Sequence, residues 1–140
     1  MRDRVSRGNF TPEDSPDTFW STIAQANRDR AALRRILMSM TREEIIDFYN
    51  DFEDAATELT EDPFFQYQSI SEDSMLDIAK WVVSQGKEFY SEILQFPHEM
   101  PQEETEEMVM TTLAGVAGKV FGERFKEAIP YRLDERDKRS

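Results

Sequence analysis

The sequence contains no cysteine and a single histidine, His98, in 140 residues. Without cysteine the chain can form neither disulfides nor thiolate metal sites, and it has no thiol nucleophile. One histidine cannot complete an H-E-x-x-H zinc motif, because Gln102 stands where the second histidine would be. Nor can it supply the two Glu-x-x-His motifs of a di-iron bundle. We therefore predict a protein that uses no metal or other cofactor.

Long hydrophobic runs are also missing, and a bilayer-spanning helix needs ~20 apolar residues. The first eight residues are mostly charged or polar and precede no apolar stretch, so they are unlike a secretory signal. Basic residues are scarce: 17 Lys and Arg face 29 Asp and Glu, which gives a net charge of −12. This charge disfavours nucleic acids and anionic membranes as partners. We expect a cytoplasmic protein.

No segment shows the strict alternation of a half-buried strand, whereas apolar residues recur at helical spacing in several segments. Ten phenylalanines provide material for a core, and 140 residues suit one domain. The sequence predicts an all-α, single-domain compact bundle of about five helices over residues 15–130. A flexible N-terminal arm (1–14) and a charged C-terminal tail (131–140) are expected to flank it, and the oligomeric state is left open.

Helix start signals locate the first two helical segments. Ser15-Pro16-Asp17 predicts a helix start, and this helix is expected to continue to Leu37 with a break near Asn27. Thr41-Arg-Glu-Glu44 is a capping box, which predicts a second helix running to about Leu59.

Two more helical segments are predicted in the second half of the chain. Ser71 is expected to cap a third helix that reaches Gly86, with helical spacing continuing to Phe96. A fourth is predicted from about Gln102 to Phe121, with Val109 on its buried side. Three glycines between positions 115 and 122 weaken this last helix, which predicts either a close helix crossing or an early end. Trp20 and Trp81 are both predicted in the core.

The charge map shows that the acidity is confined to the middle of the chain. Residues 41–107 contain three basic and nineteen acidic side chains, whereas the segments on either side are each slightly basic. Within this block six acids recur at steps of three and four, which predicts one carboxylate stripe opposite the apolar side of the second helix: Glu43, Asp47, Asp51, Asp54, Glu58 and Glu61.

Two interpretations of this stripe stay open. It is either a solvated side that keeps the protein soluble or a docking surface for a basic protein partner, such as a toxin or an enzyme. If it is a docking surface, reversing Asp51 and Asp54 to lysine should make the free protein slightly more stable, by relieving repulsion, and should weaken the binding of the basic partner. The aromatic segment that follows is a second candidate for partner binding, through Phe64, Phe65 and Tyr67.

Short motifs in the chain resemble those of a family of small bacterial helical domains of unknown function that is common in actinobacteria. The motifs are Asp17-Thr-Phe-Trp20, Ser71-Glu-Asp73 and Trp81-Val-Val-Ser-Gln-Gly-Lys-Glu-Phe-Tyr90, and the resemblance covers residues 17–125. It implies a helical fold and no assigned enzyme activity. Some members resemble accessory or immunity proteins encoded near toxin genes.

The resemblance also indicates an alternative site. The paired acids after the serine are Glu72 and Asp73 here, and Gln85 lies in the last motif, so these three form an alternative ligand site. The basic residue that members often place two positions before the tryptophan is replaced by Ala79, which weakens an enzymatic interpretation. Our leading hypothesis is a noncatalytic, immunity-type inhibitor of a basic toxin or enzyme. The alternative is a small carboxylate-dependent enzyme or ligand-binding regulator.

Overall fold

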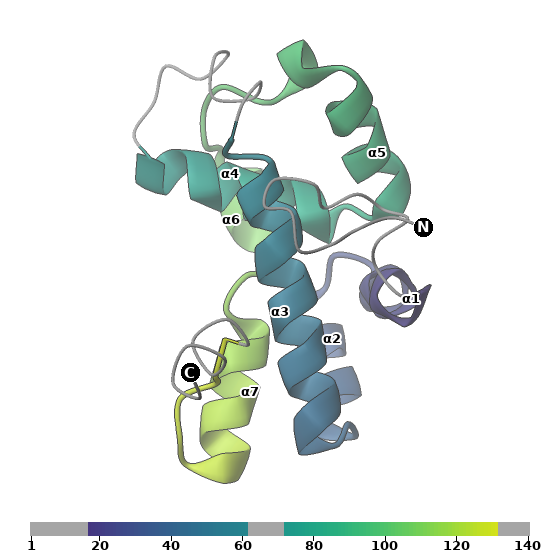
Figure 1. Ribbon diagram of the computed structural model, residues 1–140, viewed down its shortest axis with the longest axis vertical. Coiled ribbons are helices and arrows are strands. Elements are labelled where there is room, and N and C mark those ends of the chain that lie inside the picture. The colour runs from purple at the N-terminus through teal and green to yellow at the C-terminus, as the bar shows by residue number, and fades with distance from the viewer. Residues whose placement is uncertain (1–16, 62–71, 132–140) are drawn as a thin grey trace, which may run out of the picture.

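The 17-residue helix α3 (Arg42–Glu58) runs through the centre of the computed structural model, and most other helices lie around it (Figure 1). The structure describes residues 17–61 and 72–131. The predicted arm over residues 1–14, the tail after Tyr131, and the segment with Phe64, Phe65 and Tyr67 therefore lie outside the described residues. Within the described ranges the chain is all-α without strands, which confirms the predicted fold class.

The other helices form two groups around α3. Beside its N-terminal half lie α2 (Arg30–Met38) and α7 (Val116–Phe125), with α1 (Asp17–Ala26) next to α2. Across its C-terminal end runs α4 (Glu72–Ser84), joined by α5 (Lys87–Gln95), the 3-10 turn Pro97–Glu99 and the short α6 (Glu106–Thr111) (Figure 1). The two groups are held together by the apolar side of α3.

Aromatic side chains build the centre of the core. Phe19 of α1 packs against Phe48 and Phe52 of α3, with ring centroids 5.3 and 6.5 Å apart. Trp20 lies 5.3 Å from the ring of Tyr90, whose hydroxyl donates a 2.9 Å hydrogen bond to the carbonyl oxygen of Ala55. This cluster connects α1, α3 and α5, and Trp20 is only 5% exposed, so its predicted core position is confirmed.

Local signals predicted several boundaries correctly. The capping box is present, because the Glu44 N–H donates to Thr41 Oγ1 at 3.1 Å and the Thr41 N–H donates to Glu44 Oε1 at 2.8 Å. The expected break near Asn27 is confirmed: Asn27 and Arg28 have φ of 49° and 62°. Asp29 then caps α2 by accepting from two backbone N–H groups of its first turn.

The prediction of one helix from Gln102 to Phe121 is wrong, because the chain breaks between α6 and α7. α6 ends at Thr111, where Thr112 adopts an extended conformation, and Gly115, with a left-handed φ of +84°, directly precedes the first residue of α7. The connector of residues 112–115 is held by tertiary hydrogen bonds: Arg30 Nη1 donates to the carbonyl oxygens of Thr112 and Ala114, both at 2.8 Å. The Leu113 N–H donates to Ser84 Oγ at 2.8 Å.

This break changes which side chains are buried. Val109, predicted to face inward, is 64% exposed although it lies within α6, and the buried residue of this short helix is Met108. The core prediction for Trp81 is met only in part, since Trp81 is half-buried at the edge of the core. Its Nε1 donates to Thr111 Oγ1 at 2.9 Å, which ties α4 to α6.

The glycines of α7 provide a test of the predicted close crossing. A methyl group at Gly118 would lie 3.7 Å from Ile129 Cγ2, and one at Gly122 would lie 3.8 Å from the Glu127 carbonyl oxygen. Both distances are ordinary contacts. Gly118→Ala and Gly122→Ala should therefore each raise the free energy of unfolding by about 0.5–1 kcal/mol, as measured by urea denaturation.

Gly115→Ala is the matched control for this pair. Its positive φ of +84° is unfavourable for alanine although nothing lies within 4 Å, so it should lower the free energy of unfolding by about 1–2 kcal/mol. A loss of stability in Gly118→Ala as large as that in Gly115→Ala would show that α7 is crossed more closely than these distances indicate.

Candidate functional site

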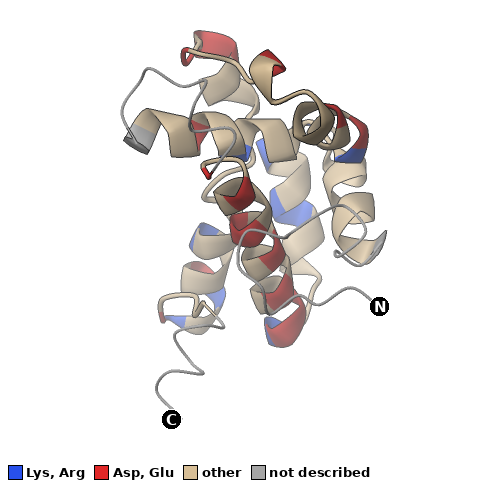
Figure 2. Ribbon diagram, turned by 45° about the horizontal axis from the view of Figure 1, so that its top comes forward, with Lys and Arg blue, Asp and Glu red and all other residues tan. Residues whose placement is uncertain are grey.

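Helix α3 has the largest concentration of charge of any described helix, with seven acids and one base along its whole length (Figure 2). Glu43 and Glu44 lie in its first turn, where carboxylates interact favourably with the helix dipole. Glu43 and Asp47 are exposed to solvent, whereas Asp54, Glu58 and Glu61 are half-buried. We call these five residues, Glu43, Asp47, Asp54, Glu58 and Glu61, the acidic face.

Asp51 does not belong to the exposed part of this side. Its side chain is only 4% exposed, so the prediction that all six acids form one solvated stripe is wrong at this position. The neighbouring Asn50 is 1% exposed and donates to the carbonyl oxygens of Ile46 at 2.8 Å and Pro130 at 3.3 Å. Helical spacing correctly assigned Asp51 to the polar side of α3, but it could not show that this side is shielded from solvent at Asp51.

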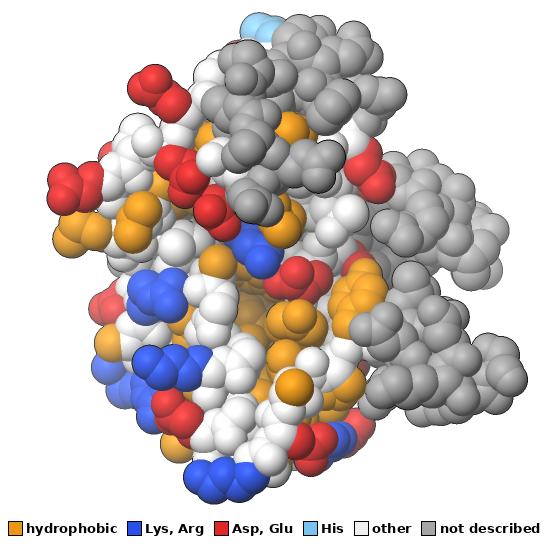
Figure 3. Space-filling model, turned by 90° about the vertical axis from the view of Figure 1, so that its left-hand side faces the viewer, with side chains coloured by type: hydrophobic (Ala, Val, Ile, Leu, Met, Phe, Trp, Pro, Cys, Tyr) orange, Lys and Arg blue, Asp and Glu red, His pale blue; other side chains and the backbone are white. Residues whose placement is uncertain are grey.

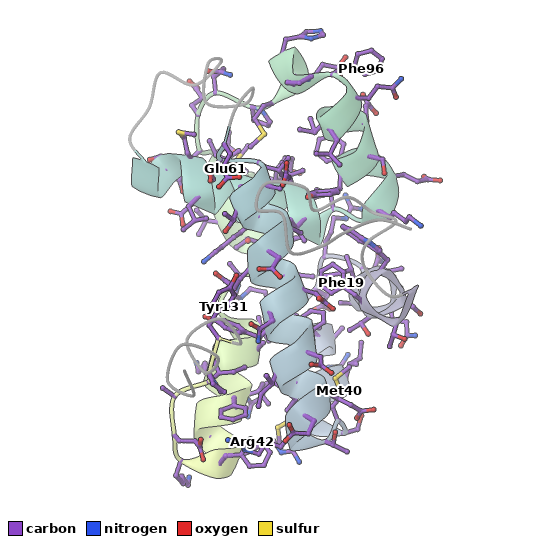
Figure 4. All side chains as sticks on the ribbon, viewed as in Figure 1. Phe19, Met40, Arg42, Glu61, Phe96 and Tyr131 are labelled. Carbon is purple, nitrogen blue, oxygen red and sulfur yellow. The ribbon has the colours of Figure 1, made fainter. Side chains whose placement is uncertain are left out.

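The chain after α7 returns to the middle of α3. Lys126 ends α7 with φ 59°, Ile129 packs against the core, and the Tyr131 hydroxyl donates a hydrogen bond to Asp54 Oδ1. In Figure 4 Tyr131 lies beside the middle of α3, between Arg42 at one end and Glu61 at the other. Asp54 is thus partly occupied by a contact within the protein, and the fully exposed acids of the acidic face are Glu43 and Asp47.

Arg42 is the cation at the start of the acidic face. Its guanidinium lies 3.4 Å from Glu43 Oε1 and 2.9 Å from Glu127 Oε1, and it stacks 5.2 Å from the centre of the Phe121 ring. The hydrogen bond that Arg42 donates to the Glu127 carboxylate raises the pKa of Arg42 above its ordinary value. Arg42 is therefore bound mainly to α7 and its C-terminal connection, while Asp47 has no ion-pair partner among the described residues.

One arginine of α2 and one arginine of α7 hold these two helices together. Arg34 Nη2 lies 2.6 Å from Glu123 Oε1, and this hydrogen bond lowers the pKa of the Glu123 carboxyl. Arg124 Nη1 donates to the carbonyl oxygens of Leu37 and Met40 at 3.3 and 2.6 Å, at the C-terminal end of α2. Both arginines therefore bind groups within the protein.

Of the alternative ligand site, the structure describes only the side chain of Gln85. Glu72 and Asp73 begin α4, but their side chains lie outside the described residues. Gln85 is half-buried and its Nε2 donates to the carbonyl oxygen of Trp81 at 3.1 Å, so its amide is bonded to its own helix end.

One serine and lysine pair at helical spacing, Lys80 and Ser84, has structural contacts. Ser84 is 1% exposed, donates to the Lys80 carbonyl oxygen at 2.8 Å, and accepts the Leu113 N–H. Lys80 Nζ lies 3.5 Å from Glu53 Oε2. A buried hydroxyl that is bonded to two backbone groups is not placed to attack a substrate.

A carboxyl pair that the sequence spacing did not indicate lies between α5 and the 3-10 turn. The hydrogen bond with Glu99 raises the pKa of Glu92 above its ordinary value, and the negative charge of Glu99 adds to this effect. Both residues are exposed, as is His98 next to Glu99. Only the turn at Phe96 brings the two acids together, and their seven-residue separation in the sequence carries no specific signal.

Comparisons with known proteins give one match. A family model described as a protein of unknown function (DUF4240) matches residues 15–123. No curated protein and no solved structure matches the chain. In residues 17–61 and 72–131, no three His, Cys, Asp or Glu side chains are grouped so that they could hold a metal ion. The same ranges contain no helix of the length and hydrophobicity needed to cross a membrane.

Asp47 and Asp51 lie one turn apart and should respond in opposite ways to lysine. Asp47→Lys replaces an exposed charge that is repelled by Glu43, and it should raise the free energy of unfolding by about 0.5 kcal/mol. Asp51→Lys buries a longer cation in place of a 4% exposed carboxylate and should lower it by about 3 kcal/mol. Urea denaturation of both variants measures the difference. Equal stability of Asp51→Lys and the unmodified protein would show that Asp51 is solvated.

The carboxyl pair predicts a pH effect at one residue. Glu99→Ala removes both the hydrogen bond and the negative charge that raise the pKa of Glu92, so this pKa should fall towards its ordinary value. Because a raised folded-state pKa contributes stability at low pH, the variant should lose stability on the acid side of the Glu92 titration and not above it. NMR titration of the Glu92 carboxyl carbon measures the shift, and an unchanged pKa would contradict the pairing.

Proposed function

The chain belongs to the DUF4240 family of proteins of unknown function, and from its own surface we propose that it is a noncatalytic protein-binding domain whose acidic face docks a basic protein. The observation that carries this proposal is the exposure of Glu43 and Asp47 on the side of α3 opposite its buried residues Ile45, Phe48 and Phe52. Docking is the function for which this arrangement provides both charge and access.

Electrostatics supports a basic partner. Carboxylates four residues apart on a helix repel one another by about 0.2–0.5 kcal/mol per pair, and a bound cation relieves this repulsion. A surface of one charge sign also accelerates the encounter with a surface of the opposite sign, and this acceleration decreases with salt. Since the central block of the chain contains nineteen acids and three bases, the attraction is not cancelled locally.

The footprint that we propose begins at the N-terminal end of α3. Glu43 and Asp47 form its open part, Asp54 and Glu58 extend it along the helix, and Glu61 follows the helix end; these last three positions are half-buried. Asp51 is left out because it is 4% exposed. The aromatic residues Phe64, Phe65 and Tyr67 follow Glu61 in the sequence and stay a prediction for the anchor of the same interface.

An immunity-type role is the finer form of the proposal. Such a protein covers the working surface of a basic toxin or enzyme and needs no catalytic group of its own. The engagement of Ser84 and Lys80 in structural contacts is consistent with this role. So is the resemblance of the chain's motifs to a bacterial family that includes immunity-like members. We place this activity in the bacterial cytoplasm.

The test compares two charge-reversed baits. The unmodified protein and the double variant Glu43→Lys/Asp47→Lys are immobilised and exposed to lysate of the source organism. A basic protein should be retained by the unmodified chain and lost by the double variant. With that protein purified, the double variant should associate at least tenfold more slowly at low salt, and the difference should shrink as salt is raised, by surface plasmon resonance.

A matched control has the same change in net charge on another helix. Glu88→Lys/Glu92→Lys reverses two exposed acids of α5 and should keep the association rate within about twofold. The purified partner should also lose its own activity at one equivalent of the unmodified protein. If the double variant on α3 associates as fast as the control at low salt, the acidic face is a solvated surface and the proposed function is wrong.

A further inference from the structure

The most exposed large hydrophobic side chains of the described residues are two neighbours on α6. Val109 is 64% exposed and Met110 is 71% exposed. Four acids of the same segment are exposed around them in the sequence: Glu103, Glu104, Glu106 and Glu107. The face in Figure 3 shows exposed hydrophobic side chains next to acidic ones at its edge. We call these six residues the α6 patch.

The α6 patch is held on a fixed support. A six-residue helix is not stable alone, so α6 depends on contacts with the rest of the protein. Met108 and Leu113 are buried at 8% and 2% exposure, and Thr111 accepts the hydrogen bond from Trp81 Nε1. The Thr105 hydroxyl caps its first turn by accepting from the Met108 N–H at 3.3 Å. The buried side is thus fixed, and Val109 and Met110 lie on the other side.

Exposed apolar groups of this size cost solubility unless a function uses them, and a charged rim around them is typical of a binding site. Methionine is well suited to such contacts because its unbranched side chain adapts to the partner's shape. A second copy of this chain is a poor occupant, since it would bring two sets of four carboxylates together. A partner with an apolar centre and a basic rim matches the α6 patch in both respects.

We infer that the α6 patch is a second docking surface, which takes an amphipathic helix whose apolar side is flanked by lysine or arginine. The apolar side of this helix covers Val109 and Met110, and its basic flanks face the four glutamates. In Figure 1 α6 lies behind α3 and α4, on a separate element from the acidic face. The inference is independent of the proposed function, and a protein with both surfaces can connect two basic partners.

The probe is a synthetic 18-residue helical peptide with leucine on one side and lysine on both flanks. Two matched peptides replace either its leucines by serine or its lysines by glutamate. Fluorescence anisotropy with labelled peptides measures affinity for the full chain. We expect the Leu/Lys peptide to bind at least tenfold more tightly than either matched peptide. Its binding should also change the fluorescence of the half-buried Trp81, which is bonded to α6.

Variants separate this surface from general charge attraction. Val109→Ser/Met110→Ser changes only exposed side chains and should reduce the affinity for the Leu/Lys peptide to that of the Ser/Lys peptide. Met38→Ser is the matched control, because Met38 is 44% exposed on α2 and lies outside the α6 patch; it should leave binding unchanged. Glu43→Lys/Asp47→Lys should keep the tenfold preference for leucine, although it abolishes docking on the acidic face.

Three results would overturn the inference. The first is equal affinity of the unmodified protein and Val109→Ser/Met110→Ser for the Leu/Lys peptide, including the absence of binding to both. The second is equal affinity of the unmodified protein for the Leu/Lys peptide and for the peptide with glutamate in place of lysine, which would show that the partner needs no basic rim. The third is dimerisation of the unmodified chain that is lost in Val109→Ser/Met110→Ser, measured by sedimentation, which would make a second copy the occupant.

Discussion

The packing of helices on the apolar side of α3 is the constraint on which the rest of the structure depends. Phe48 and Phe52 receive Phe19 from α1, and the carbonyl oxygen of Ala55 receives the hydroxyl of Tyr90 from α5. α4 and α7 pack directly on α3 at its two ends, and α2 and α6 then lie against these helices (Figure 1). Because one side of α3 is used by so many neighbours, its acids are left on the other side.

Polar groups inside the fold have structural tasks that follow from this packing. Once the chain turns at Gly115, the backbone groups of residues 112–114 need hydrogen-bond partners away from helix interiors, and Arg30 and Ser84 supply them. Asn50 similarly bonds the carbonyl oxygen of Pro130 where the chain returns to α3. A residue such as Ser84, which has catalytic chemistry in principle, is therefore committed to holding a connection.

The surface that remains is divided by charge and by chemistry. Cations of α2 and α7 bind partners within the protein, including Glu123 and the carbonyl oxygen of Met40. The exposed acids of α3 combine charge with access, whereas α6 combines exposed apolar groups with a carboxylate rim. These are different recognition chemistries: the first acts over distance and is weakened by salt, and the second requires contact. The acidic face and the α6 patch both favour a basic partner, the first through long-range attraction and the second through its carboxylate rim.

The features that the sequence determined by itself are those that depend on local chemistry. The Thr41–Glu44 capping box and the break at Asn27 depend on neighbours within a few residues, so spacing and residue type were sufficient to predict them. The all-α class follows in the same way from helical periodicity. The six-acid stripe was met only in part, because five of the six acids lie on α3, Glu61 follows its end, and Asp51 is buried.

Only the tertiary structure decided what covers each side of a helix. Asp51, on the polar side of α3, is only 4% exposed, and Val109, on the predicted inward side of α6, is 64% exposed. The pairing of Glu92 with Glu99 and the partial burial of Trp81 likewise depend on how separate elements meet. Helical spacing shows which residues share one side of a helix. Whether that side is buried depends on segments distant in sequence, and for this reason the burial of these residues could not be predicted from the sequence.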